Sequence, residues 1–155
     1  MDRKSIKHLA LPICLLLLTA SILTACSRQN ESTQPELGLC NSDQKLAVSD
    51  HISGQISALE KLDFKKAYTY AAKSFQEGFT LDQFEAVISG QYQMLITNNG
   101  YRFTECLAEE GYFVQSVSVA TNSGEVDLTY RLTLIDKRLG VVAVTVKPSS
   151  LDLNT

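Results

Sequence analysis

The sequence lacks the residue sets on which several classes of enzyme and metalloprotein depend. Its 155 residues include two histidines, four cysteines and no tryptophan. No HxxxH, CxxC or acidic calcium-loop spacing is present, so we expect no metal site. The Gly-x-Ser-x-Gly motif and the glycine-rich phosphate loop are also missing, which argues against a serine hydrolase and a nucleotide-binding enzyme. We therefore expect no cofactor.

Long apolar runs are scarce as well, and the longest one lies near the start of the chain. Residues 9–18 are almost entirely apolar and follow a basic head with Arg3, Lys4 and Lys7. The run is shorter than the ~20 apolar residues of a membrane-spanning helix. A basic head, a short apolar centre and an exit of small residues are typical of a bacterial signal peptide. We predict that residues 1–25 are such a peptide.

The residues at the predicted cleavage site, Leu23-Thr24-Ala25-Cys26, resemble a bacterial lipobox. The resemblance implies that Cys26 carries a diacylglyceryl group and anchors the protein to a membrane of the cell envelope. That membrane is the outer membrane in a two-membrane host, and otherwise the outer face of the plasma membrane. Two or three acyl chains hold a protein firmly, because each buried CH₂ contributes ~0.8 kcal/mol. The alternatives are an ordinary signal peptide with Cys26 as a spectator, and an uncleaved anchor.

Cleavage leaves an acidic chain with one further pair of cysteines. Residues 1–25 hold three basic residues and one acidic residue, so the net charge changes from −3 to −5. An acidic surface argues against nucleic acid as a partner, because phosphate contacts need a basic face. Cys14 leaves with the signal peptide and Cys26 is lipidated. We predict a disulfide between Cys40 and Cys106, with two separate buried thiols as the alternative.

The rest of the chain divides into a tether, one domain and a tail. Residues 26–41 are polar and contain Pro35 and Gly38, which predicts a flexible tether. Residues 42–148 are predicted to form a single domain with a real core. Residues 149–155 are predicted to be a frayed tail.

The first half of this domain has the periodicity of helices. Apolar residues at helical spacing predict one helix over about 42–61, a second over 63–78 and a third that begins at Thr80. Asp63 is the expected N-cap of the second helix. Thr80 and Gln83 are expected to form a capping box, in which each side chain satisfies a backbone N–H of the other residue.

The second half has the period of two that is typical of strands. The change follows the turn Asn98-Asn99-Gly100, and four segments of alternating or apolar residues then come in succession, at 101–107, 112–120, 126–134 and 141–147. Short turns between them predict an antiparallel meander. Helices followed by strands predict an α+β domain.

The stretch from Ile52 to Tyr68, ISGQISALEKLDFKKAY, resembles the opening of the nuclear-transport-factor-2-like superfamily. More narrowly, residues 46–147 are similar to a bacterial family called domain of unknown function 4864. The matching residues are Gln55, Ala58, Leu59, Asp63, Ala67, Tyr68, Ala71, Phe75, Phe84, Tyr92 and Gly124. The chain departs from the superfamily pattern at Gly140-Val141, where a Gly-x-Trp strand is usual.

The resemblance implies a cystatin-like cone, in which three helices pack into the concave side of a curved four-stranded antiparallel sheet. A pocket often lies at the open end of such a cone, and Tyr68, Tyr92 and Tyr130 are the candidate pocket residues. The superfamily includes ketosteroid isomerase, scytalone dehydratase and many members without enzyme activity, so the fold does not decide the function.

We expect a non-enzymatic, membrane-anchored envelope lipoprotein that binds a small apolar ligand or a protein partner, which could be a second copy of itself. One alternative is a pocket enzyme of the isomerase or dehydratase type, which needs a general base in an apolar cavity. Asp50, His51 and Asp63 are candidates by composition only, and none matches a catalytic position of the enzyme members. Another alternative is an accessory subunit of an envelope assembly.

Overall fold

The structure is a computed structural model and describes residues 37–147. The predicted signal peptide, Cys26, most of the predicted tether and the tail at 149–155 lie outside the described residues. Within the described range, none of the helices has the length and apolar character needed to cross a membrane.

The longest helix, α1, spans Ser42–Glu60 and agrees with the first helix predicted from the sequence. Asn41 caps its start, because its side chain accepts a hydrogen bond from the N–H of Gln44 and the Gln44 side chain accepts one from the N–H of Asn41. One face of α1 is buried, at the spacing expected of an amphipathic helix. Its buried residues are Val48, Ile52, Gln55, Ile56, Ala58 and Leu59.

The prediction of one continuous helix over 63–78 is wrong. Two short helices occupy this stretch, α2 at Phe64–Tyr68 and α3 at Lys73–Gly78. The expected cap of the first is confirmed, because the Asp63 carboxylate accepts a hydrogen bond from the N–H of Lys66. The domain therefore has four α-helices rather than three.

The last α-helix, α4, spans Leu81–Gln91 and begins where the capping box predicts. The Thr80 hydroxyl accepts from the N–H of Gln83, and the Gln83 side chain accepts from the N–H of Thr80. A 3₁₀ turn, η1 at Gln93–Leu95, then leads towards the sheet.

The sheet has five antiparallel strands in the order β1-β2-β3-β4-β5, one more than the predicted four. Their bounds are Gly38–Leu39 for β1, Tyr101–Glu109 for β2, Tyr112–Thr121 for β3, Gly124–Ile135 for β4 and Arg138–Val146 for β5. The meander of β2 to β5 is as expected. The sequence pattern places β1 in the tether, whereas the structure pairs Gly38 with Ala108 and Leu39 with Leu107.

Pairing with β5 explains why the predicted second helix is interrupted. Between α2 and α3 the chain lies alongside β5, where the N–H of Ala72 donates to the Val141 carbonyl at 2.8 Å. The N–H of Val141 donates to the Tyr70 carbonyl at 2.9 Å. These bonds satisfy backbone groups that a continuous helix would otherwise use. We call residues 69–72 the α2–α3 link.

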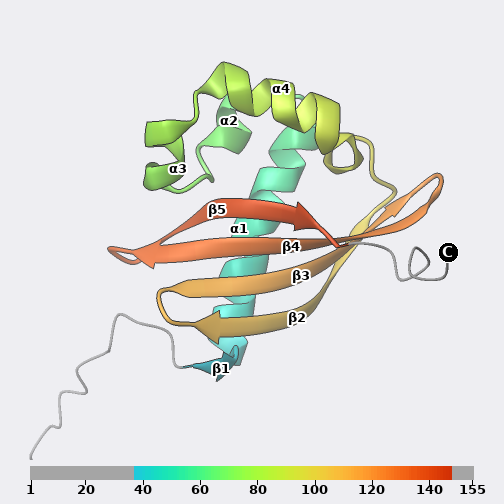
Figure 1. Ribbon diagram of the computed structural model, residues 1–155. Coiled ribbons are helices and arrows are strands. Elements are labelled where there is room, and N and C mark those ends of the chain that lie inside the picture. The colour runs from blue at the N-terminus through green and yellow to red at the C-terminus, as the bar shows by residue number, and fades with distance from the viewer. Residues whose placement is uncertain (1–36, 148–155) are drawn as a thin grey trace, which may run out of the picture. The chain divides into compact units, whose positions relative to one another are not determined.

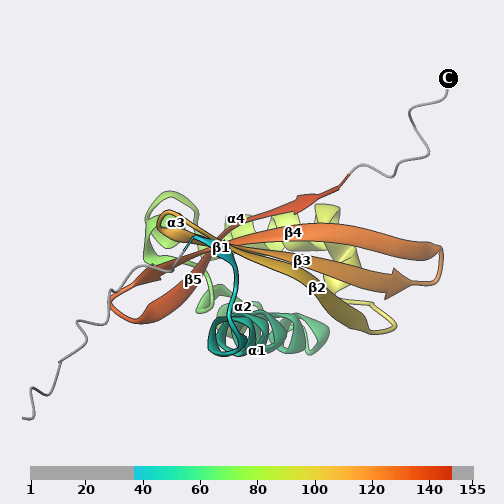
Figure 2. The same cartoon turned by 90° about the horizontal axis from the view of Figure 1, so that it is seen from below.

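The helices and the sheet enclose one hydrophobic core. Helix α1 covers one face of the sheet, whereas α2, α3 and α4 lie beyond the β5 edge (Figure 1). The view from below shows the sheet nearly edge-on with α1 on one side of it (Figure 2). The largest fully buried side chains are Tyr130, Ile52, Ile56, Leu59, Leu95, Leu128 and Leu132. Because the three later helices sit at an edge, they leave space between themselves and β5.

Candidate functional site

An apolar cavity of about 250 Å³ lies between α4 and the edge of β5. We call it the α4–β5 cavity. Its wall residues are Gln55, Ala71, Phe75, Phe79, Phe84, Val87, Ile88, Tyr92, Leu95, Val141, Val142, Ala143 and Val144. Eleven of these thirteen residues are apolar and none is charged, so the wall suits a neutral apolar molecule.

Aromatic packing holds α3 and α4 together on one side of this cavity. The ring of Phe75 lies 5.0 Å from that of Phe79 and 6.4 Å from that of Phe84, measured between centroids. The Tyr68 ring lies 5.5 Å from the Phe84 ring. Tilted and edge-on arrangements of this kind are the favourable ones for aromatic pairs. The aromatic wall is therefore preformed.

Tyr92 joins the two sides of the cavity. It follows the last residue of α4, and its hydroxyl donates a hydrogen bond to the Val144 carbonyl of β5 at 2.6 Å. The hydroxyl proton is used in this bond, and the oxygen keeps lone pairs that can accept.

Gln55 is the other polar wall residue, and it is only 3 % exposed. Its Nε2 donates to the Ala67 carbonyl across a long 3.4 Å, which directs the NH₂ group of the amide towards that carbonyl. Among the described residues no group donates a hydrogen bond to its Oε1, and this oxygen keeps some contact with solvent. Gln55 thus brings to the wall of an apolar cavity an amide whose oxygen has no partner among the described residues.

The three tyrosines predicted from the sequence do not share one pocket. Tyr92 lines the α4–β5 cavity, whereas Tyr68 lines a second cavity and donates its hydroxyl proton to the Phe79 carbonyl. Tyr130 lines neither cavity and is fully buried in the core. Within the part of the chain that the structure describes, its hydroxyl has no hydrogen-bond partner. Burial raises the Tyr130 pKa far above its ordinary value, and the hydroxyls of Tyr101 and Tyr92 add to this effect.

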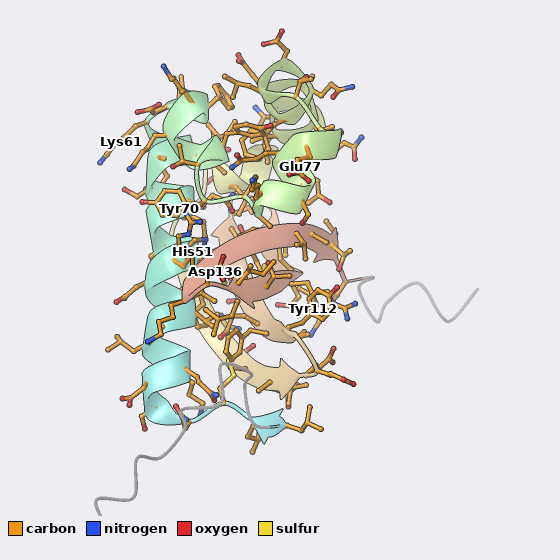
Figure 3. The ribbon with its side chains drawn as sticks, turned by 90° about the vertical axis from the view of Figure 1, so that its left-hand side faces the viewer. His51, Lys61, Tyr70, Glu77, Tyr112 and Asp136 are labelled. Carbon is orange, nitrogen blue, oxygen red and sulfur yellow. A yellow bond between two sulfur atoms is a disulfide. The ribbon has the colours of Figure 1, made fainter. Side chains whose placement is uncertain are left out.

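The second cavity, of about 690 Å³, lies between α3 and the β4–β5 hairpin. Its wall carries charges of both signs, on Lys73, Glu77, Asp136 and Arg138. Figure 3 shows this side of the molecule, with Glu77 on α3 and Asp136 at the hairpin. Mixed charge of this kind is typical of a solvated surface and does not define a ligand.

His51 connects α1 to the α2–α3 link. Its Nε2 donates to the Tyr70 carbonyl at 2.8 Å, and the two rings meet edge-on at 5.1 Å (Figure 3). Burial lowers the pKa of His51 below its ordinary 6.5, and the hydrogen bond to Tyr70 partly opposes this shift. Gly54 allows the Tyr70 ring to lie against α1, because a Cβ at residue 54 would lie 2.5 Å from the Tyr70 hydroxyl. His51 is thus placed as a structural contact.

Cys40 and Cys106 lie at disulfide distance, as expected from the sequence. Their Cα atoms are 5.4 Å apart and both residues are buried. The bond joins the end of β1 to β2, beside the backbone hydrogen bond from the Cys40 N–H to the Cys106 carbonyl. Across residues 37–147, no group of three or more potential ligand residues is placed to hold a metal ion.

The fold and the cavity define an α+β domain with an apolar pocket at the edge of an antiparallel meander. Residues 41–150 match the model of the family described as "Domain of unknown function (DUF4864)", and the chain belongs to this family. Comparison with curated proteins and with solved structures yields no match. The narrower family resemblance of the sequence is therefore confirmed.

Proposed function

We propose that this protein is an envelope lipoprotein whose domain binds a small, neutral, apolar ligand in the α4–β5 cavity. The observation that carries the proposal is the composition of the wall, which has eleven apolar residues, two polar ones and no charged one. A ligand that fills such a cavity gains dispersion contacts and leaves water, and both effects favour binding. We also propose that the domain belongs to the nuclear-transport-factor-2-like superfamily, which the order of helices and meander strands supports.

The lipobox-like sequence at Cys26 supports the membrane anchor. Gly38, the first residue of β1, lies twelve residues after Cys26. A flexible chain of this length reaches roughly 20 Å, so the domain would stay close to the membrane surface. Apolar molecules concentrate in the bilayer, and an anchored domain would meet them there.

We propose binding without catalysis. An isomerase or dehydratase needs a general base within hydrogen-bond reach of its substrate. Among the described residues that line the α4–β5 cavity there is neither a carboxylate nor a histidine. His51 is bound to the Tyr70 carbonyl and does not line this cavity.

A protein partner is the second candidate, and one observation favours it. Leu39 of β1, Leu107 of β2 and Val114 of β3 are cross-strand neighbours, and they lie on the opposite face of the sheet from the buried residues that alternate with them. Leu39 is 73 % exposed. This row could contact a second copy or a subunit of an envelope assembly. If so, Leu39→Glu would lower the oligomeric mass measured by analytical ultracentrifugation, and an unchanged mass would argue against this surface.

Naphthalene is a suitable probe of the proposed ligand site. The full chain in lipid vesicles should bind one naphthalene saturably, beyond the partitioning measured by equilibrium dialysis with empty vesicles. Val87→Trp should abolish binding, because Val87 lines the cavity and a larger side chain fills it. Ala86→Trp is the matched control, because Ala86 is the exposed neighbour on the same helix. Absence of saturable binding, or equal binding by the two variants, would refute the proposal.

A further inference from the structure

The polar side chains of the α4–β5 cavity offer acceptor oxygens, and the one hydroxyl proton among them is already used in a hydrogen bond. The Tyr92 hydroxyl donates to the Val144 carbonyl. The Gln55 amide directs its Nε2 to the Ala67 carbonyl, so the amide oxygen remains. That oxygen accepts nothing from the described residues, although the Gln55 side chain is almost completely buried.

We propose that the cavity selects a neutral, mainly apolar ligand that carries one hydrogen-bond donor, which binds to Gln55 Oε1. This inference rests on the proposed function and names its ligand class. A ligand that fills the cavity displaces water from this oxygen. A carbonyl oxygen left without a partner is unfavourable, and a ligand N–H or O–H satisfies it. A ligand with only acceptors leaves it unsatisfied. A charged ligand would lose its hydration without meeting an opposite charge in the wall.

The volume and the aromatic residues narrow the class further. A cavity of ~150 Å³ holds benzene, so by proportion the 250 Å³ here suits about ten non-hydrogen atoms. Phe75, Phe79 and Phe84 present rings against which a flat ligand can pack. The class is therefore a small phenol, an aromatic or alicyclic alcohol, or an indole-like amine with a neutral N–H.

Indole and 1-benzothiophene test this inference, because they have nearly the same shape and only indole has a donor. Both are titrated against the full chain in vesicles, with empty vesicles as the reference. The chain has no tryptophan, so indole fluorescence is read without an indole signal from the protein. Gln55→Met keeps the length of the side chain and removes the acceptor.

We expect Gln55→Met to weaken indole binding by about three- to tenfold, the effect of one neutral hydrogen bond. Binding of 1-benzothiophene should change less than twofold. Gln93→Met makes the same replacement at an exposed glutamine that lines neither cavity, and it should leave the indole affinity unchanged. Equal effects of Gln55→Met on both compounds, or an equal loss of indole affinity in Gln93→Met, would overturn the ligand class while leaving the binding function intact.

A measurement on the unaltered chain covers the case in which Gln55→Met does not fold. Methylation of the indole nitrogen removes the donor and makes the molecule more apolar. The hydrophobic effect alone would make 1-methylindole the tighter ligand. We expect it to bind more weakly than indole, and tighter binding would overturn the inference. If none of the three compounds binds, the proposed function itself fails.

Discussion

Gly140 lies where β5 packs tightly against the α2–α3 link, and its replacement by alanine tests how that link is held. A Cβ at this position would lie 2.5 Å from the Cα of Ala72 and 2.9 Å from its N and Cβ atoms. The φ angle of Gly140 is not positive, so alanine is excluded here by the neighbouring backbone rather than by its own conformation. Gly140→Ala must therefore push β5 and the link apart.

Two responses are open to the protein, and both cost free energy. If the backbone stays in place, overpacking of a well-packed interior destabilises by ~1–3 kcal/mol. If the link moves away, the Ala72 to Val141 and Val141 to Tyr70 hydrogen bonds weaken, at ~1 kcal/mol each. Alanine also lowers the entropy of the unfolded chain, which offsets less than ~1 kcal/mol of this loss of stability. We expect the free energy of unfolding to fall by about 2 kcal/mol.

Urea unfolding followed by far-ultraviolet circular dichroism measures this change. Gly90→Ala is the matched control, because Gly90 is exposed in α4 and a Cβ there meets nothing within 4 Å. Alanine favours a helix over glycine by ~0.5–1 kcal/mol, so the control should be as stable as the unaltered protein or more stable. If Gly140→Ala behaves like Gly90→Ala, the close packing of the link against β5 is refuted.

Three further predictions concern the disulfide, the histidine and the anchor. Replacing Cys40 and Cys106 by alanine should lower the free energy of unfolding in urea by ~4 kcal/mol, because the bond spans 66 residues; a loss below ~1 kcal/mol would contradict this. The folded-state pKa of His51 is lowered, so the unfolded chain binds the proton more readily, and stability should fall as the pH drops below about 6.5. His51→Gln should reduce that pH dependence, and an unchanged slope would show that other groups cause it. Mass spectrometry of the membrane fraction should find a chain that starts at an acylated Cys26, with no such species for Cys26→Ser; an unmodified N-terminus would refute lipidation.

Local signals in the sequence were sufficient for the elements that depend on neighbouring residues. The cap at Asp63 and the box of Thr80 and Gln83 appear as predicted, because each joins residues only three positions apart. The strands β2 to β5 follow from their alternation and their short turns. The pairing of Cys40 with Cys106 followed from the number of cysteines left after the predicted cleavage.

Contacts between distant segments were not predicted from the sequence. The apolar spacing over 63–78 fits one helix. Only the tertiary structure shows that the backbone of the α2–α3 link forms hydrogen bonds with β5 instead. Strand β1 has two residues, too few for any periodicity, and pairing with β2 is what makes it a strand. Tyr130 fits a pocket by composition, yet its place at the centre of β4 buries it completely.

The sequence by itself determined the α+β class, the order of the elements and the family resemblance. Periodicity, caps and turns depend on residues that are only a few positions apart. The sequence also carries the lipobox-like segment at Cys26. The tertiary structure decided where an apolar cavity remains and which polar atoms line it. In the sequence Gln55 is one more position on a helix. Only the packing of α2, α4 and β5 next to it makes it a wall residue of a cavity. A cavity is the space that packing leaves between elements, and no single element specifies it.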